Sequence, residues 1–108
     1  MQLTVERTEN RFYVSVAGEV DLATAPELDT VLLAAIVNQP QEIVIDLTDV
    51  SFLDSTGLGV IVRALKRTRE RGTSLNIIAS NERVLKVFAI TGLDTVLSIH
   101  PTLAALDS

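Results

Sequence analysis

A short polar run, Asp54-Ser55-Thr56-Gly57, stands immediately before an apolar stretch with helical spacing. A carboxylate or hydroxyl at this position can accept hydrogen bonds from the free N–H groups of the first helical turn, which stabilises a helix by about 1 kcal/mol. The same position also presents a hydroxyl for modification. A phosphate on Ser55 would add about −1.5 to −2 charges beside a helix N-terminus, where the dipole and free amides favour negative charge. The residues alone leave both interpretations open, a helix cap or a regulated serine.

Catalytic and metal sites fit this segment poorly. A phosphate-binding loop requires the lysine of G-x-x-x-x-G-K-[ST], and "GLGVIVRA" contains none. A serine nucleophile needs a base, but the single histidine, His100, lies far along the chain beside Pro101, where we expect a surface residue. Asp46, Asp49 and Asp54 could form a magnesium or phosphoacceptor site, yet no adjacent acid pair or matching lysine accompanies them. We therefore expect no enzyme activity, no cofactor and no metal.

The composition predicts one small domain, residues 1–108. Of the 108 residues, 47% are hydrophobic, which is enough for one core. The absence of cysteine excludes disulfides and thiolate metal sites. No segment approaches the roughly 18 apolar residues of a membrane span, and the first residues lack the basic and apolar regions of a signal peptide. We expect a cytoplasmic protein that makes no membrane contact and is monomeric when free.

Charge is distributed unevenly along the chain. The net charge of −5 disfavours binding to a nucleic-acid backbone. Residues 1–54 contain ten acidic residues but only Arg7 and Arg11 as basic ones, an excess that suits a basic protein partner. Five of the nine basic residues fall just after the polar run, where we expect the solvated face of a helix: Arg63, Lys66, Arg67, Arg69 and Arg71.

Hydrophobic periodicity predicts the elements that position the polar run. Alternating apolar residues at 3–5 and 12–16, with "TEN" between them, predict an antiparallel pair of strands. Thr24 and Glu27 have the spacing of a capping box, which predicts a helix that Asn38 and Pro40 terminate. After the polar run, the predicted apolar helix face consists of Leu58, Ile61, Val62 and Leu65, and Gly72 ends the helix.

The remaining segments complete an alternating pattern. Short apolar runs at 42–47, 74–79 and 95–99 predict buried strands, a third helix extends from Asn81 to Gly92, and a short helix follows Pro101. The order ββαβαβαβα predicts an α/β fold with a mixed sheet of about five strands, parallel except for the opening pair.

Three segments together resemble the STAS domain, the fold shared by sulfate transporters and anti-sigma-factor antagonists. They are "VAGEVDLATAPEL", "DLTDVSFLDSTGLGVIV" and "VFAITGLDTVLSI", and they occur in the family's order and spacing. The resemblance covers essentially the whole chain, and within the family it is greatest to the stand-alone bacterial anti-sigma-factor antagonists.

The resemblance implies a partner switch in which this chain catalyses nothing. In the family, the unphosphorylated antagonist binds an anti-sigma factor that is also a serine kinase, and this frees the sigma factor. Phosphorylation of the serine that follows the motif's aspartate ends the binding, and a serine phosphatase restores it. In this chain that serine is Ser55.

The resemblance also implies a set of partner contacts: Asp21, Asp54, Thr56 and Gly57. Asp21 lies in the "GEVD" segment and is expected to contact the partner, with an ordinary turn residue as the alternative interpretation of this aspartate. We expect close backbone approach to explain Gly57 and Gly59. The alternative function is a STAS subunit of another assembly that binds constitutively, with Ser55 acting only as a helix cap.

Overall fold

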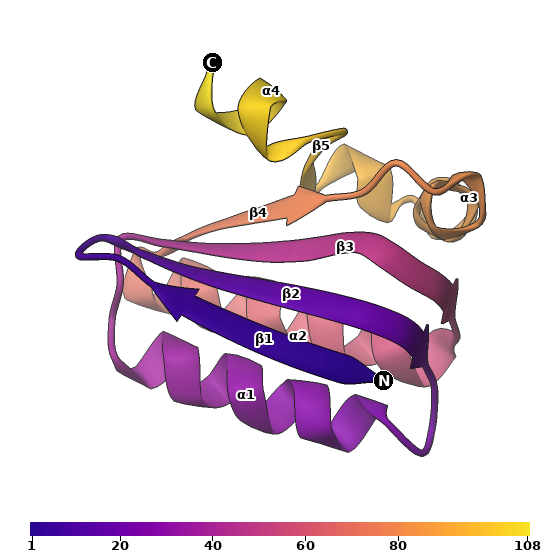
Figure 1. The fold of residues 1–108 in the computed structure, drawn as a ribbon, viewed down its shortest axis with the longest axis horizontal. Helices are drawn as coiled ribbons and strands as arrows, with labels where there is room; N and C mark the ends of the chain where they lie inside the picture. Colours follow the sequence, from indigo (N-terminus) through magenta and orange to yellow (C-terminus); the bar gives the residue numbers. More distant parts are fainter.

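Five strands form one mixed sheet in the order β1-β2-β3-β4-β5 (Figure 1). In this computed structural model, which describes residues 1–108, β1 (Gln2–Arg7) runs antiparallel to β2 (Arg11–Val20). The parallel strands are β3 (Glu42–Leu53), β4 (Ser74–Ile78) and β5 (Ser98–His100). The helices are α1 (Ala25–Val37), α2 (Ser55–Arg71), α3 (Glu82–Thr91) and α4 (Leu103–Asp107). The predicted α/β class, element order and mixed five-stranded sheet are confirmed.

The main core lies between one face of the sheet and helices α1 and α2, which lie side by side against it (Figure 1). Alternate residues of β2 and β3 point into this core because successive side chains of a strand face opposite ways. Among the fully buried side chains are Val14, Ile45, Leu28 and Ile61. Helix α3 packs against β3 and adds Phe88 to the same cluster, whereas α4 lies on the other side of the sheet from α1 and α2 (Figure 1).

Strand β3 extends six residues beyond the predicted end at Leu47. Its pairing with β2 shifts register twice, and at each shift β3 advances by one residue more than β2. These bulges break the two-residue alternation, so that only Val50 and Leu53 are buried in the last part of the strand. The sequence prediction stopped at residue 47 because the apolar run ends there, at Thr48 and Asp49. Bulges bend a strand and commonly re-aim side chains near functional sites.

Two further local predictions were wrong. Thr24 stands at the N-cap of α1 but makes no capping bond, because its hydroxyl turns back to the preceding loop and lies 3.0 Å from the Glu19 carbonyl oxygen. The last strand begins at Ser98 rather than at residue 95, since Leu93–Thr95 form a short 3₁₀ helix, η1. The N–H groups of Val96 and Leu97 both donate to the Leu93 carbonyl oxygen, which removes them from any strand ladder. The predicted caps at Asn38, Gly72, Asn81 and Gly92 are confirmed.

The buried face of α2 differs from the predicted one. Its fully buried residues are mostly small: Gly57, Val60, Ile61, Ala64 and Thr68. Of the predicted face only Ile61 is fully buried, while Leu58, Val62 and Leu65 are half-buried on the flank. Small residues allow the helix axis to lie close to the sheet, which turns the buried stripe away from the bulkier side chains.

The basic residues of α2 lie on its solvated face as predicted, since all but the half-buried Arg67 are exposed. Arg63 and Arg67 lie 3.5 Å and 3.1 Å from the Asp29 carboxylate of α1. Arg69 donates a hydrogen bond to the Val96 carbonyl oxygen at 3.3 Å. Two of the five therefore connect the helices, and Lys66 remains exposed.

The two glycines near the start of α2 have different roles, which gives a matched pair of substitutions. A Cβ on Gly57 would lie 2.7 Å from Leu53 Cδ1 and 2.8 Å from Val20 Cγ1, whereas a Cβ on Gly59 meets nothing nearer than Arg63 Nη1 at 3.6 Å. Close approach thus explains Gly57 but not Gly59, for which the prediction was wrong.

Gly57→Ala should lower the free energy of unfolding by about 1–3 kcal/mol through overpacking. Gly59→Ala should raise it by up to about 1 kcal/mol because alanine favours helix. Urea denaturation checks both, and equal effects at the two positions would contradict the assignment.

Candidate functional site

The ends of β2 and β3 meet the start of α2 at one end of the molecule (Figure 1). The last paired residues of the two strands are Val20 and Leu53. The Asp54 N–H donates to the Val20 carbonyl oxygen at 3.1 Å, which fixes the loop after β2 beside the N-terminus of α2. The structure therefore brings the segments of Asp21 and Asp54 together, as the resemblance implied. No sequence signal indicated this backbone contact, because any residue type at position 20 supplies the same carbonyl.

Asp54 is the cap of α2. Its backbone is extended, with φ −95° and ψ −176°, and its Oδ1 accepts a hydrogen bond from the Gly57 N–H at 3.0 Å. Ser55 is the first residue of the helix and is exposed, and its hydroxyl has no hydrogen-bond partner within the chain. The two interpretations that the sequence left open, a helix cap and an accessible hydroxyl, thus belong to two neighbouring residues. Asp54 caps the helix, and Ser55 presents a free hydroxyl to solvent.

The Asp21 carboxylate holds the loop that leads into α1. Its Oδ1 accepts hydrogen bonds from the N–H groups of Ala23 and Thr24 at 3.0 Å and 3.1 Å, and the Thr24 hydroxyl lies 3.1 Å away. All of these contacts use Oδ1, so Oδ2 has no partner in the chain. Asp21 is therefore a turn residue whose second oxygen is still available to another molecule.

Thr56 and Gly57 occupy the first turn of α2. Thr56 is half-buried, whereas Gly57 is buried against Val20 and Leu53. Gly57 can therefore influence a partner contact only indirectly, because its close packing determines how near Ser55 lies to the strand ends.

Two of the three carboxylates considered for magnesium, Asp46 and Asp54, hold hydrogen bonds within the chain. Asp46 accepts hydrogen bonds from the Tyr13 hydroxyl and from Thr48. Burial and the bond to Asp46 raise the pKa of Tyr13, so the phenol stays protonated and donating. Asp54 faces the helix start, and no three His, Cys, Asp or Glu side chains are grouped so that they could hold a metal ion.

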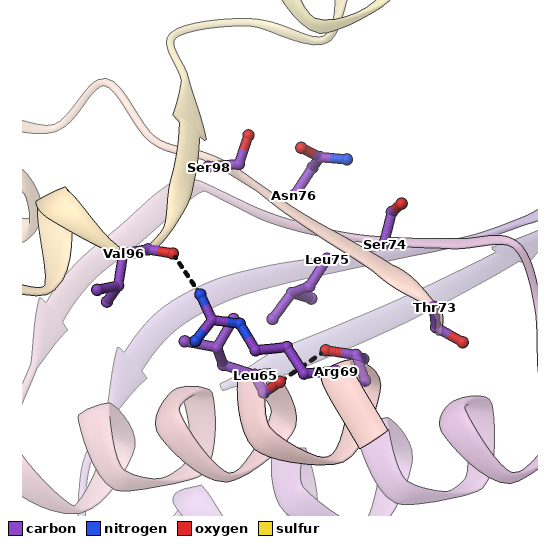
Figure 2. A pocket seen from close by; sticks show the side chains of 9 residues that line it. Leu65, Arg69, Thr73, Ser74, Leu75, Asn76, Val96 and Ser98 are labelled. Carbon is purple, nitrogen blue, oxygen red and sulfur yellow. Dashed lines mark hydrogen bonds between the residues drawn. The ribbon is translucent and has the colours of Figure 1, made fainter. Parts of the chain in front are cut away.

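A cavity of about 360 Å³ lies elsewhere, between the C-terminal half of α2 and strand β4 (Figure 2). It is lined by Leu65, Thr68, Arg69, Thr73, Ser74, Leu75, Asn76, Val96 and Ser98. At 1.5 Å per residue, Leu65 is about 15 Å along the helix from Ser55, so the cavity does not belong to the site. His100 pairs with Ser98 at 3.0 Å on β5 and is half-buried.

Comparison with known proteins identifies the family. The family model described as the STAS domain matches residues 2–106. The chain belongs to the STAS domain family. Its α/β element order and its mixed sheet are therefore those of a STAS domain.

Named relatives of this STAS domain are regulatory proteins. It is 40% identical to an anti-sigma-B factor antagonist of Listeria monocytogenes, over 87% of this chain and 82% of the relative. It is 38% identical to that of Bacillus subtilis, over 92% and 90%. A solved anti-sigma factor antagonist from Mycobacterium paratuberculosis superposes with a TM-score of 0.90 at 33% identity, covering 98% of this chain and 91% of the other. None of the helices in this STAS domain is sufficiently long and apolar to span a membrane.

The assignment of Asp54 as the cap and of Ser55 as a free hydroxyl can be tested by measuring the free energy of unfolding. Asp54→Ala should lower the free energy of unfolding by about 1 kcal/mol, because the Gly57 N–H loses its acceptor. Ser55→Ala should change it by less than about 0.5 kcal/mol, because this hydroxyl makes no bond within the domain. Denaturant unfolding of both variants checks the difference. A loss of unfolding free energy for Ser55→Ala as large as that for Asp54→Ala would contradict this assignment.

Proposed function

We propose that the chain is an anti-sigma-factor antagonist switched by phosphorylation of Ser55. The unphosphorylated chain binds an anti-sigma factor with serine kinase activity in the cytoplasm, which frees a sigma factor. Phosphorylation ends this binding, and a serine phosphatase restores it. The observation that carries the proposal is the exposed, unbonded Ser55 hydroxyl at a helix start that Asp54 already caps. The names of the relatives support the antagonist function.

The fold tolerates a phosphate at this position. Ser55 is the first residue of α2, where the helix dipole and unpaired amides favour negative charge by about 0.3–1 kcal/mol. The phosphate would not displace a bond of the cap, since that bond belongs to Asp54. Modification should therefore leave the domain folded.

A partner docked over the same end would not tolerate it. The phosphate would add its charge to Asp21 and Asp54, which already lie at this end. An unpaired charge buried at an interface typically costs about 2–5 kcal/mol, enough to weaken binding by about 30-fold or more. The switch then requires no change in fold, only a change in the charge that the partner must desolvate.

Substitutions at Ser55 test the switch. Ser55→Ala should bind the anti-sigma factor as the unmodified protein does and stay bound in the presence of MgATP. Ser55→Asp should keep its fold and bind at least about 30-fold more weakly. Titration calorimetry with each purified anti-sigma factor of the source organism gives the affinities, and Thr56→Ala is the matched control.

Two results would count against the proposal. Equal affinity of Ser55→Asp and the unmodified protein would place this helix end outside the interface. Binding without any phosphate transfer would favour the constitutive STAS subunit, with Ser55 having no regulatory role.

Long-range charge provides a second test. If a basic partner surface docks at the acidic end, association should slow several-fold as salt rises from 0.1 M to 1 M, because the Debye length shrinks from about 10 Å to about 3 Å. Asp21→Asn should lower the association rate and flatten this salt dependence. Lys66→Gln, on the exposed face of α2, should not. Stopped-flow measurements of the association rate check both variants. A lower association rate for Lys66→Gln but not for Asp21→Asn would place the contact on the basic face of α2 instead.

A further inference from the structure

Two large apolar side chains stand exposed at the end of the molecule that carries Ser55. Leu22 is 75% exposed and Phe52 is 49% exposed. Single exposed apolar residues are normal on protein surfaces, and the chain has others: Val5, Leu33, Val37, Ile90 and Val96. Only Leu22 and Phe52, however, belong to the two segments that the β2–β3 pairing brings to the start of α2.

The backbone holds both residues at this end. Phe52 is in the β3 ladder opposite Glu19, directly after the second register shift, and its neighbour Leu53 is buried beneath Gly57. Leu22 follows Asp21, whose carboxylate and carbonyl oxygens bind the N–H groups of the next turn. A backbone that is already ordered loses little further freedom on binding, which favours affinity.

The surrounding charge indicates the kind of partner. Residues 12–62 contain no lysine, arginine or histidine, and the acidic residues of the two segments are Glu19, Asp21, Asp49 and Asp54. This pattern disfavours a second copy of the same chain, since like charges would face each other. Protein interfaces combine an apolar centre with a polar rim. The surface of a partner that would match this end of the domain is therefore an apolar pocket surrounded by basic residues.

The dimensions allow one partner to contact both side chains. The domain measures 32 × 31 × 23 Å along its principal axes. A standard interface buries about 800 Å² on each partner, which is comparable with one whole end of such a domain. An interface of this size at the Ser55 end has room for both Leu22 and Phe52, which lie in the two segments that meet there.

We infer that Leu22 and Phe52 are the apolar anchors of the docking surface, and that they fit an apolar pocket with a basic rim on the anti-sigma factor. This inference rests on the proposed function and adds the residues that supply the affinity. The phosphate at Ser55 then acts beside a contact that excludes water, where an unpaired charge is most costly.

Paired substitutions separate the anchors from exposed apolar residues in general. Leu22→Ala and Phe52→Thr remove the anchors, and threonine retains strand propensity. Val37→Ala on α1 and Val5→Thr on β1 are the controls, since these residues are 52% and 46% exposed and lie in other segments. The unphosphorylated proteins are titrated calorimetrically with the purified anti-sigma factor, beside Ser55→Asp. Thermal unfolding confirms that all variants fold.

Each anchor substitution should weaken binding at least about ten-fold, and each control by less than about two-fold. In the kinase reaction, the anchor variants should raise KM for the chain while kcat changes little, because they dock and take no part in phosphate transfer. Wild-type affinity of both anchor variants, while Ser55→Asp fails to bind, would overturn this inference and leave the proposed function standing. Failure of the unsubstituted chain to bind any anti-sigma factor would overturn both. Self-association through these residues, detected by light scattering, would overturn the partner assignment.

Discussion

The hydrogen bond from the Asp54 N–H to the Val20 carbonyl oxygen holds together everything proposed for this end of the molecule. It joins the loop after β2 to the start of α2, two segments more than thirty residues apart in the sequence. The fit of Gly57 against Val20 and Leu53 permits this approach, since a side chain there would force the helix away from the strand ends. With both contacts in place, the segments of Asp21, Asp54 and Ser55 are held beside one another. The Ser55 hydroxyl and the second carboxylate oxygen of Asp21 make no bond within the chain and are free to meet a partner.

This arrangement separates stability from regulation. A residue that capped the helix and also accepted a phosphate would couple every modification to the stability of α2. Here the cap is the Asp54 carboxylate, and the neighbouring Ser55 hydroxyl makes no bond within the chain. In the proposed switch, a phosphate on Ser55 would leave the core between the sheet and α1 and α2 intact. Its energetic cost would fall on the interface with the partner, where a desolvated charge is far more costly than on an exposed helix end.

The sequence predicted those features that depend on neighbouring residues. Alternation over short runs gave the opening hairpin, and Asn81, Gly72 and Gly92 gave helix ends, because each of these signals acts within one turn. It misjudged features that depend on distant contacts. The bulges in β3 arise from pairing with β2, and the buried stripe of α2 follows from close packing at Gly57 and Ala64. Thr24 and Glu27 have the spacing of a capping box, but the Thr24 hydroxyl is engaged by the preceding loop instead. At the site, sequence could not decide between Asp54 and Ser55 as the cap, since both residue types suit that position equally.

The central claim is that Ser55 is the residue through which a kinase controls this domain. The most direct measurement is mass spectrometry of the intact, unsubstituted chain and of its peptides after incubation with MgATP and the purified anti-sigma kinase. The account predicts a single phosphate per chain, located on Ser55, with loss of the complex at the same rate as phosphate is gained. A phosphate located on Thr56 or elsewhere, or a complex that persists after Ser55 is fully modified, would contradict it.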